Sequence, residues 1–362
     1  MECVVVGAGI SGLLCARELI GAGWRVKIID KSRVGREASW AGGGILSPLY
    51  PWRQPNPIRE LALWSQQEYP ALASSLREST GIDPEWQRCG MLWLDLPDFD
   101  NAIDWCRQHQ VACQHLDKAE VLRLQANLNV SAHGRHLWDP GIAQIRNPRL
   151  VQALRQELGR LGVEFLERHP LLGWQLNGNR VTSLRVPQGN LSADLFVMAA
   201  GAWSALSSPA DHWRPEIWPV KGQMLLYRTK PGLLGPMVQR GDHYLIPRLD
   251  GRILVGSTVE EADFDKRPTA EAHRILSRFA LETFPLLAEF PLELHWAGMR
   301  PASPDGIPYI GPHPQLENLY YDCGHFRNGV VMAPAAARLL GDLILGRAPC
   351  VDPRPYLPAN RP

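Results

Sequence analysis

The feature that most constrains this chain is a glycine pattern near its amino end, Gly7-Ala8-Gly9-Ile10-Ser11-Gly12. A β-branched run at residues 3–6 precedes the pattern, and an apolar-periodic stretch at 11–20 follows it. This order predicts a strand, a tight turn and a helix. An alternating run at 24–30 ends in Asp30 and completes a βαβ unit. The sequence therefore predicts a parallel sheet that includes residues 3–6.

Each glycine of this pattern has a mechanical reason in a dinucleotide site. Gly7 permits the tight turn, Gly9 lets the backbone approach a pyrophosphate, and Gly12 lets the helix pack against the strand. The helix start offers unpaired N–H groups to phosphates. Asp30, eighteen residues after Gly12, can accept hydrogen bonds from both ribose hydroxyls. The alternative is a tight turn that binds nothing, but the combination favours dinucleotide binding.

Two further segments favour FAD over NAD. Residues 195–201, LFVMAAG, have the pattern of a buried strand that ends in small residues, among them Ala200 and Gly201. Residues 42–44 are three consecutive glycines between apolar neighbours, as expected where a flat group must touch the backbone. The alternatives are an ordinary core strand and a flexible surface loop.

The stretch 298–345 holds a fourth signal. Gly329 stands where a long apolar helix begins, and the N-terminus of a helix favours a nearby anion. A reduced flavin is such an anion, so this placement would favour hydride acceptance. The apolar run contains Arg338 and Asp342, so we predict a core helix rather than a membrane span.

The remaining patterns predict a mixed architecture. Residues 171–197 predict a three-stranded meander, and Asp250-Gly251 predicts an antiparallel hairpin. Asn147 is expected to cap a helix that Pro148 enters. Helical patterns lie at 57–80, 98–108 and 147–161.

The predicted fold class is therefore α/β, a Rossmann-like FAD-binding domain of the glutathione-reductase type with an inserted α+β substrate domain that carries an antiparallel sheet. No linker is visible in the sequence, so the second domain is expected to arise from insertions into the first. The predicted boundaries are 1–85, 141–208 and 297–362 for the FAD-binding domain, and 86–140 and 209–296 for the substrate-binding domain.

Charge and cysteine content exclude several classes of protein. The 38 Lys+Arg and 37 Asp+Glu residues nearly cancel, so no basic field attracts nucleic acid or an anionic membrane. The seven cysteines are odd in number and show neither CxxC spacing nor a Cys/His cluster, which argues against a disulfide framework and a metal site. We expect a cytoplasmic protein with small-molecule partners. Whether it forms a homo-oligomer stays open.

Together these segments resemble the D-amino-acid oxidase superfamily, and most closely its bacterial glycine oxidases of thiamine biosynthesis. The resemblance runs nearly end to end and is carried by GAGISG, ASWAGGGILSP, HYLIPR, GMRPASPDGIPYIGP and GHFRNGVVMAPAAARLL. It implies non-covalent FAD. The motifs and the resemblance together assign these cofactor positions: Gly7, Gly9, Ile10, Ser11, Gly12, Asp30, Lys31, Ala38, Ser39, Gly43, Gly44, Ile45, Leu171, Ala200, Gly201, His325, Phe326, Arg327, Asn328, Gly329, Val330 and Val331.

The resemblance also implies the residues that act on the substrate. Arg300 would bind the substrate carboxylate as a bidentate pair, with a hydrogen bond from Tyr244. Arg327 matches a second arginine near the site, for which a structural ion pair is the alternative. His325 is expected to be a hydrogen-bonded core residue rather than a catalytic base. Trp40 is a further candidate for the wall of the site.

Three positions depart from the family pattern. Asp30 replaces the commoner glutamate, which keeps the acceptor but shortens its reach. Val259 stands where a larger pocket residue is expected. Pro301-Ala302 occupies the place of the cysteine that tethers flavin in the related sarcosine oxidases, so a covalent link is not expected.

The implied reaction is oxidative deamination of glycine and other small amines, such as sarcosine and small D-amino acids. A hydride passes from the α-carbon to FAD, and O2 is the final acceptor. The products would be an imine, which gives glyoxylate and ammonia, and hydrogen peroxide; handing the imine to a thiazole synthase is a further possibility. The alternatives are a D-amino-acid or sarcosine oxidase or dehydrogenase, a tRNA-modifying flavoprotein, and a flavin-bearing subunit without catalysis.

Overall fold

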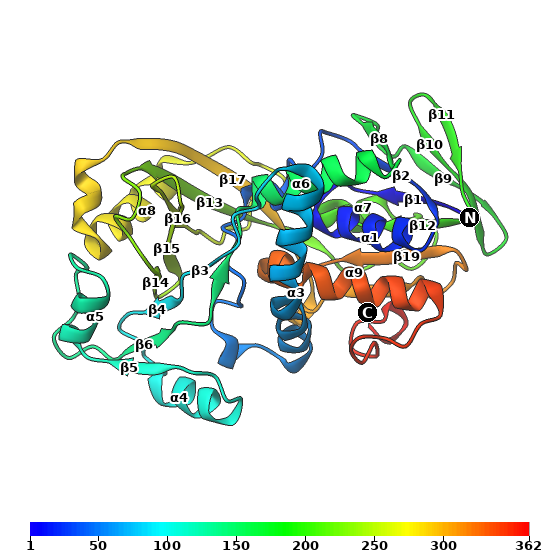
Figure 1. The fold of residues 1–362 in the computed structure, drawn as a ribbon. Coiled ribbons are helices and arrows are strands. Elements are labelled where there is room, and N and C mark those ends of the chain that lie inside the picture. The colour runs from blue at the N-terminus through cyan, green and yellow to red at the C-terminus, as the bar shows by residue number, and fades with distance from the viewer. Residues whose placement is uncertain (362) are drawn as a thin grey trace.

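A parallel sheet forms around the amino-terminal strand, as predicted. The computed structural model describes residues 1–361 and places six strands in the order β18-β19-β12-β1-β2-β8 (Figure 1). Neighbouring strands are parallel, except that β18 runs antiparallel to β19. The strands are β1 (Glu2–Val6), β2 (Arg25–Asp30), β8 (Glu164–Glu167), β12 (Leu195–Met198), β18 (Tyr309–Pro312) and β19 (Leu319–Cys323).

Strand β1 lies inside this sheet because both of its faces are apolar. Cys3 and Val5 belong to the core cluster that includes the helices, whereas Val4 and Val6 belong to the cluster on the opposite face. All four side chains are buried. A strand covered on both faces is a continuous apolar run, which is the pattern that residues 3–6 show.

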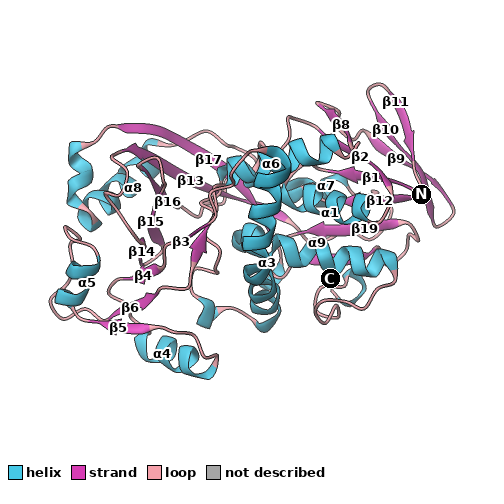
Figure 2. Ribbon diagram, in the orientation of Figure 1, coloured by secondary structure: helices cyan, strands magenta, loops and turns pink. Residues whose placement is uncertain are grey.

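Four helices share the core on one face of the parallel sheet, where the first and last lie against the strands and the other two pack on these helices (Figure 2). The last of them packs against the first two. Within residues 1–361, Phe326–Leu345 is the one segment whose length and hydropathy would suffice to cross a membrane, and it lies in this core. These helices are α1 (Ile10–Gly21), α3 (Asn56–Thr80), α6 (Asn147–Arg160) and α9 (Gly329–Leu345).

An antiparallel meander covers the opposite face. Its strands are β9 (Gly173–Asn177), β10 (Arg180–Val186) and β11 (Gly189–Ser192). Val181 and Leu184 pack in one cluster with the outward face of β1. The third run predicted for the meander is divided, because residues 195–198 leave it and enter the parallel sheet as β12.

The other half of the molecule is built on an eight-stranded sheet in the order β17-β13-β16-β15-β14-β4-β6-β5. Only the β14–β4 pair is parallel. The predicted hairpin at Asp250-Gly251 is confirmed and joins β15 to β16. The strands are β4 (Met91–Trp93), β5 (Gln114–Leu116), β6 (His136–Asp139), β13 (Trp218–Arg228), β14 (Met237–Arg240), β15 (His243–Pro247), β16 (Arg252–Gly256) and β17 (Leu292–Ala302).

Shorter elements complete the chain. A two-stranded pair, β3 (Gln87–Arg88) with β7 (Ala143–Gln144), lies between the two halves (Figure 1). The remaining helices are α2 (Ala38–Ala41), α4 (Phe99–Gln108), α5 (Lys118–Leu124), α7 (Ser204–Ser207) and α8 (Ala270–Thr283). The α/β fold with a second, antiparallel sheet is therefore as predicted. Strand β17 runs across position 297, where the sequence placed a domain boundary.

The predicted cap of α6 is wrong by one residue. Arg146 occupies the cap position, and Asn147 is already helical with no capping hydrogen bond from its side chain. Asn147 is fully buried and points toward the glycine segment 42–44, since a Cβ on Gly42 would lie 2.8 Å from its Nδ2. Tertiary packing therefore overrides the local capping preference.

Candidate active site

One cavity lies where the carboxyl ends of the parallel strands meet strands β13, β15 and β17 of the larger sheet. Ligands of open α/β sheets bind at this edge. Most of the residues that the sequence assigned to cofactor or substrate line this cavity. They are Gly7, Gly9, Ile10, Ser11, Asp30, Lys31, Ala38, Ser39, Gly43, Leu171, Ala200, Gly201, Tyr244, Arg300, His325, Phe326, Arg327, Gly329 and Val330.

Five assigned residues lie behind the cavity wall instead: Gly12, Gly44, Ile45, Asn328 and Val331. A Cβ on Gly12 would overlap the carbonyl oxygen of Gly7, which fits the predicted close packing of helix on strand. Gly44 has φ +77°, and a Cβ there would overlap the carbonyl oxygen of Ile145. These two glycines shape the wall without facing the cavity.

The turn between β1 and α1 is built for close backbone approach. Gly7 has φ +109°, and a Cβ there would overlap the Ala199 carbonyl at the end of β12. The first helical N–H, on Ile10, donates to Ser39 Oγ at 2.9 Å. The N–H groups that follow at the helix start have no partner within the helix, so they are available to an anion in the cavity.

Asp30 lies at the end of β2, where the sequence placed it. Its Oδ2 accepts a hydrogen bond from the Ala8 N–H at 2.8 Å, and its Oδ1 accepts from the Ser32 N–H at 2.7 Å. Oδ1 also accepts a hydrogen bond from Ser32 Oγ at 3.1 Å. Because each carboxylate oxygen can accept two hydrogen bonds, Oδ2 is the oxygen that retains acceptor capacity. Lys31, the next residue, stacks its Nζ 3.1 Å from the centre of the Trp203 ring, a contact that the sequence did not predict.

Arg300, on β17, is held by neutral oxygens only. Its Nη1 donates to the carbonyls of Thr258 at 3.0 Å and Lys221 at 3.3 Å, and its Nη2 donates to Ser257 Oγ at 2.7 Å. No carboxylate among residues 1–361 forms a salt bridge with Arg300. The Nε–H and one Nη2–H are not used by these three oxygens, and the Tyr244 hydroxyl lies within reach of the guanidinium.

The charges around Arg300 define the electrostatics of the site. Burial lowers the pKa of Arg300, contact with Tyr244 opposes that shift, and the positive charge of Arg327 adds to it. Arg327 is exposed on the short turn before α9 and faces the same cavity. Two guanidinium groups beside a tyrosine in a partly enclosed space are an arrangement that can bind a carboxylate.

Two glycines that the sequence analysis missed make room for these side chains. A Cβ on Gly222 of β13 would overlap the Arg300 guanidinium, and a Cβ on Gly256 of β16 would lie 2.7 Å from the Tyr244 ring. Glycine inside a strand is a sign of close approach by another group, so this signal was present in the sequence. Its partner could be known only once the strands were paired.

Two candidates lie away from the cavity. Trp40 packs edge-on against Trp296 with ring centres 5.8 Å apart and does not line the cavity. Val259 is half exposed and also lies outside the lining. The structure therefore gives neither residue a place in the wall.

His325 is buried beside Asp322, as the core position predicted for it requires, but its Nε2 forms no hydrogen bond. Its Nε2 lies 3.0 Å from Asp322 Oδ1, and Cys15 Sγ donates to Asp322 Oδ2 at 3.1 Å. Burial lowers the pKa of His325 to about 4 and raises the pKa of Asp322 to about 7. In mildly acidic solution the pair therefore contains a neutral imidazole and a protonated carboxyl.

We expect the Asp322→Asn variant to lose stability as the pH falls. In the parent protein, the raised pKa of Asp322 gives stability that is lost as pH rises toward about 7. The lowered pKa of His325 gives stability that is lost as pH falls from 6.5 toward about 4. Between about pH 4 and pH 6.5 the two pH dependences of the free energy of unfolding have opposite signs and cancel. In Asp322→Asn only the His325 term remains, so the free energy of unfolding should fall by up to about 1.4 kcal/mol for each unit by which the pH decreases.

Urea unfolding at pH 7 and pH 5 measures this slope. The matched control is His325→Gln, which leaves Asp322 alone and should show the opposite slope, with greater stability at pH 5. Parallel pH dependences in the parent protein and both variants would refute the opposed pKa shifts of Asp322 and His325.

The cavity suits a flat, phosphate-bearing cofactor because many of its lining residues are glycine or alanine, whose small size leaves space for the cofactor. A Cβ on Gly43 would lie 2.7 Å from Ile246 Cδ1, and a Cβ on Gly298 would lie 2.5 Å from Ala41 Cβ, so any larger residue would change the wall. The helix start can hold phosphate and Asp30 can hold a ribose. The glycines and alanines of the lining are Gly7, Gly9, Ala38, Ala41, Gly42, Gly43, Ala199, Ala200, Gly201, Ala202, Gly222, Gly298, Gly324 and Gly329.

Comparison with known proteins gives one consistent result. A glycine oxidase from Pseudomonas aeruginosa is 47% identical over 360 residues, which cover 99% of this chain and 98% of that protein. A protein from Synechocystis sp. named bifunctional protein ThiO/ThiG is 32% identical, with 95% of this chain and 51% of that protein covered. The crystal structure of glycine oxidase from Geobacillus kaustophilus has a TM-score of 0.92 and 29% identity, covering 98% of this chain and 97% of that one.

These matches confirm the resemblance and identify the cofactor as FAD. The family model described as DAO, FAD dependent oxidoreductase, matches residues 2–343. It spans both sheets and every residue that lines the cavity. The chain therefore belongs to the DAO family of FAD-dependent oxidoreductases.

Proposed function

We propose that this enzyme oxidises glycine, and also other small amines such as sarcosine and small D-amino acids, with O2 as the electron acceptor and hydrogen peroxide as a product. The observation that carries the proposal is Arg300, whose guanidinium lines the FAD cavity beside Tyr244 and is held by neutral oxygens only. The 47% identity to a glycine oxidase over nearly the whole chain supports the choice of substrate.

The carboxylate of the substrate would bind the guanidinium of Arg300. A planar guanidinium matches the two oxygens of a carboxylate, which a lysine ammonium cannot do. The Tyr244 hydroxyl can donate a third hydrogen bond. Arg327 at the exposed side adds positive charge that attracts the anion.

The cavity wall beside Tyr244 is closely packed around Gly43. The position of a Cβ on Gly43 is crowded by Ile246 Cδ1 at 2.7 Å, Tyr244 Cε2 at 3.4 Å and Met224 Cε at 3.6 Å. Three side chains from β13 and β15 therefore pack against the Gly43 backbone at this side of the cavity.

Positioning is the contribution that these residues make to the reaction. When bound, FAD accepts the hydride that leaves the substrate α-carbon. Arg300 and Tyr244 fix one end of the substrate, which leaves the α C–H in one orientation, and such fixing can supply about 7–11 kcal/mol of a barrier. The ammonium proton of the substrate can leave to water, so no side-chain base is required.

Peroxide production tests this function. We expect the purified protein to show the absorbance of bound FAD and to release hydrogen peroxide with glycine, and also with sarcosine or D-alanine. Reduction of an artificial acceptor without consumption of O2 would show that the enzyme is a dehydrogenase and not an oxidase. Absence of turnover with all three amines would refute the proposal.

We further propose that the imine product feeds a thiazole-forming partner. The relative named bifunctional protein ThiO/ThiG is matched over 51% of its length, so it contains a second part beyond the region that resembles this chain. The partner would act in the cytoplasm, where the seven free cysteines of this chain stay reduced.

A further inference from the structure

Arg248 is a buried guanidinium at the junction of the two halves, and no role has been given to it above. It follows β15 directly, and its backbone closes the hairpin turn, with its N–H donating to the Arg252 carbonyl at 2.7 Å. Its side chain is 7% exposed. The same strand carries Tyr244, so Arg248 is rigidly connected to the substrate side of the cavity.

The side chain leaves its own sheet and binds two segments of the other half. Its Nη2 donates to the Gly43 carbonyl at 2.7 Å, while its Nη1 donates to Gln144 Oε1 at 2.6 Å and to the Ile145 carbonyl at 3.1 Å. These segments also bind each other, since the Ile145 N–H donates to the Gly44 carbonyl at 2.8 Å. One guanidinium therefore fixes both at once.

The partners of Arg248 are unusual for a buried cation. All three acceptors are neutral oxygens, and no carboxylate in residues 1–361 forms a salt bridge with it. Burial lowers the pKa of Arg248 to about 10, so it stays charged at neutral pH. Burying a charge without a counterion is costly, and a residue that serves packing alone would not need one.

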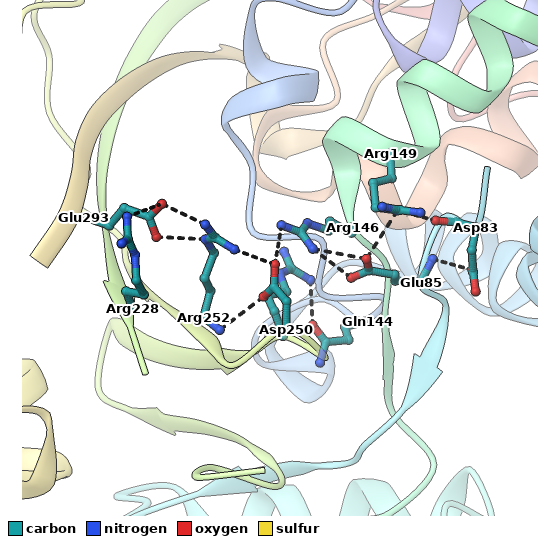
Figure 3. Close-up of polar contacts among 10 residues, drawn as sticks. Asp83, Glu85, Gln144, Arg146, Arg149, Arg228, Asp250, Arg252 and Glu293 are labelled. Atoms are coloured by element: carbon teal, nitrogen blue, oxygen red, sulfur yellow. Dashed lines mark hydrogen bonds and ion pairs between the residues drawn. The ribbon is translucent and has the colours of Figure 1, made fainter. Parts of the chain in front are cut away.

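A parallel network outside Arg248 already holds the hairpin to the other half (Figure 3). Glu293 pairs with Arg252, Arg252 pairs with Asp250, Asp250 pairs with Arg146 at 2.9 Å, and Arg146 pairs with Glu85 at 3.1 Å. These groups are partly exposed, and their pairs are screened by solvent and salt. Joining the halves therefore does not by itself require the buried cation.

In addition, Arg248 restricts the motion of the glycine segment 42–44, which borders the cofactor cavity. Gly43 lines the cavity on the side of Tyr244, and its missing side chain is the reason that the backbone can come close. A segment with three glycines is intrinsically mobile, because glycine loses more conformational freedom on ordering than any other residue. A charged donor on the Gly43 carbonyl restricts that freedom.

We propose that Arg248 is a positioning residue that fixes Gly43 against β15 and so sets the spacing between FAD and the substrate groups Tyr244 and Arg300. It touches neither cofactor nor substrate and acts through the Gly43 carbonyl. The part that concerns the substrate rests on the proposed function, whereas the part that concerns FAD does not.

Arg248→Met removes the donors and keeps most of the volume, and the test compares it with Arg146→Met. Arg146 joins the same hairpin to the same half but makes no hydrogen bond to residues 42–46. We expect Arg248→Met to raise the dissociation constant of FAD by about 10- to 100-fold, the loss for one charged hydrogen bond. FAD release on dilution, followed by flavin fluorescence, measures this without substrate.

The second measurement separates positioning from general loosening. We expect Arg248→Met to lower kcat for glycine by about tenfold with KM changed less than threefold, because the spacing and not the carboxylate site is altered. Arg146→Met should leave FAD affinity and kcat within about twofold even where it lowers the melting temperature. If wild-type protein does not oxidise glycine, the proposed function fails while FAD release still decides this proposal.

If the Arg248→Met variant does not fold, the same measurements are made on Arg248→Lys. Lysine keeps the charge but is a single point donor that cannot satisfy three separated oxygens, so a loss of FAD affinity of about threefold or more is expected. The proposal is overturned if the folded Arg248 variants bind FAD and turn over within twofold of wild type. It is overturned equally if Arg146→Met weakens FAD binding as much as they do.

Discussion

Arg300→Met is expected to lower kcat/KM for glycine by about 100- to 1000-fold, the effect of removing one partner of a buried charge pair. The variant should keep its FAD, because Arg300 approaches the cavity from β17, whereas the turn expected to hold the phosphates lies between β1 and α1. Steady-state peroxide assays measure the loss, and the visible spectrum of the purified variant measures the retained flavin.

Two control variants separate a loss of substrate binding from damage to the sheet. Arg300 also satisfies the Thr258 and Lys221 carbonyls, so part of the effect could come from the sheet. Arg252→Met removes an arginine of the same sheet that lies outside the cavity, and it should leave kcat/KM within about twofold. Arg300→Lys keeps the charge without the planar fork and should fall in between. A methionine variant with kcat/KM within threefold of wild type would remove Arg300 from the substrate site.

Gly12→Ala is expected to abolish FAD binding and to destabilise the protein by about 4 kcal/mol or more, in the extreme range for single substitutions. A Cβ at this position would overlap the backbone carbonyl oxygen of Gly7, which cannot rotate away as a side chain could. The strand-to-helix turn must shift, and with it the N–H groups that would hold the phosphates. The ratio of flavin to protein absorbance and urea unfolding measure the two effects.

The same helix provides a matched control. Gly21 is the last residue of α1, and a Cβ there would meet no atom within 4 Å. Gly21→Ala should therefore keep full FAD content and change the free energy of unfolding by no more than about 1 kcal/mol, in the stabilising direction. A yellow Gly12→Ala protein with unchanged unfolding would show that this contact is not what fixes the turn.

Local patterns predicted the FAD half of the molecule well, for a physical reason. Residues 3–6 are apolar on both faces, which is possible only for a strand covered on both sides, and the glycines after them permit one kind of turn. The helix 147–160 was found from its periodicity, yet its cap was misplaced, because the burial of Asn147 beside the glycine segment is a tertiary contact.

What the sequence determined by itself were the features whose causes lie within a few residues: the βαβ unit, the hairpin at Asp250-Gly251, and the chemical nature of Asp30 and Arg300. What only the tertiary structure decided were the pairings across the chain. Gly222 makes room for Arg300 from 78 positions away, and Arg248 binds Gly43 across 205 positions. Such pairs leave no periodic trace in the sequence, since they depend on how the two sheets meet rather than on local backbone preference.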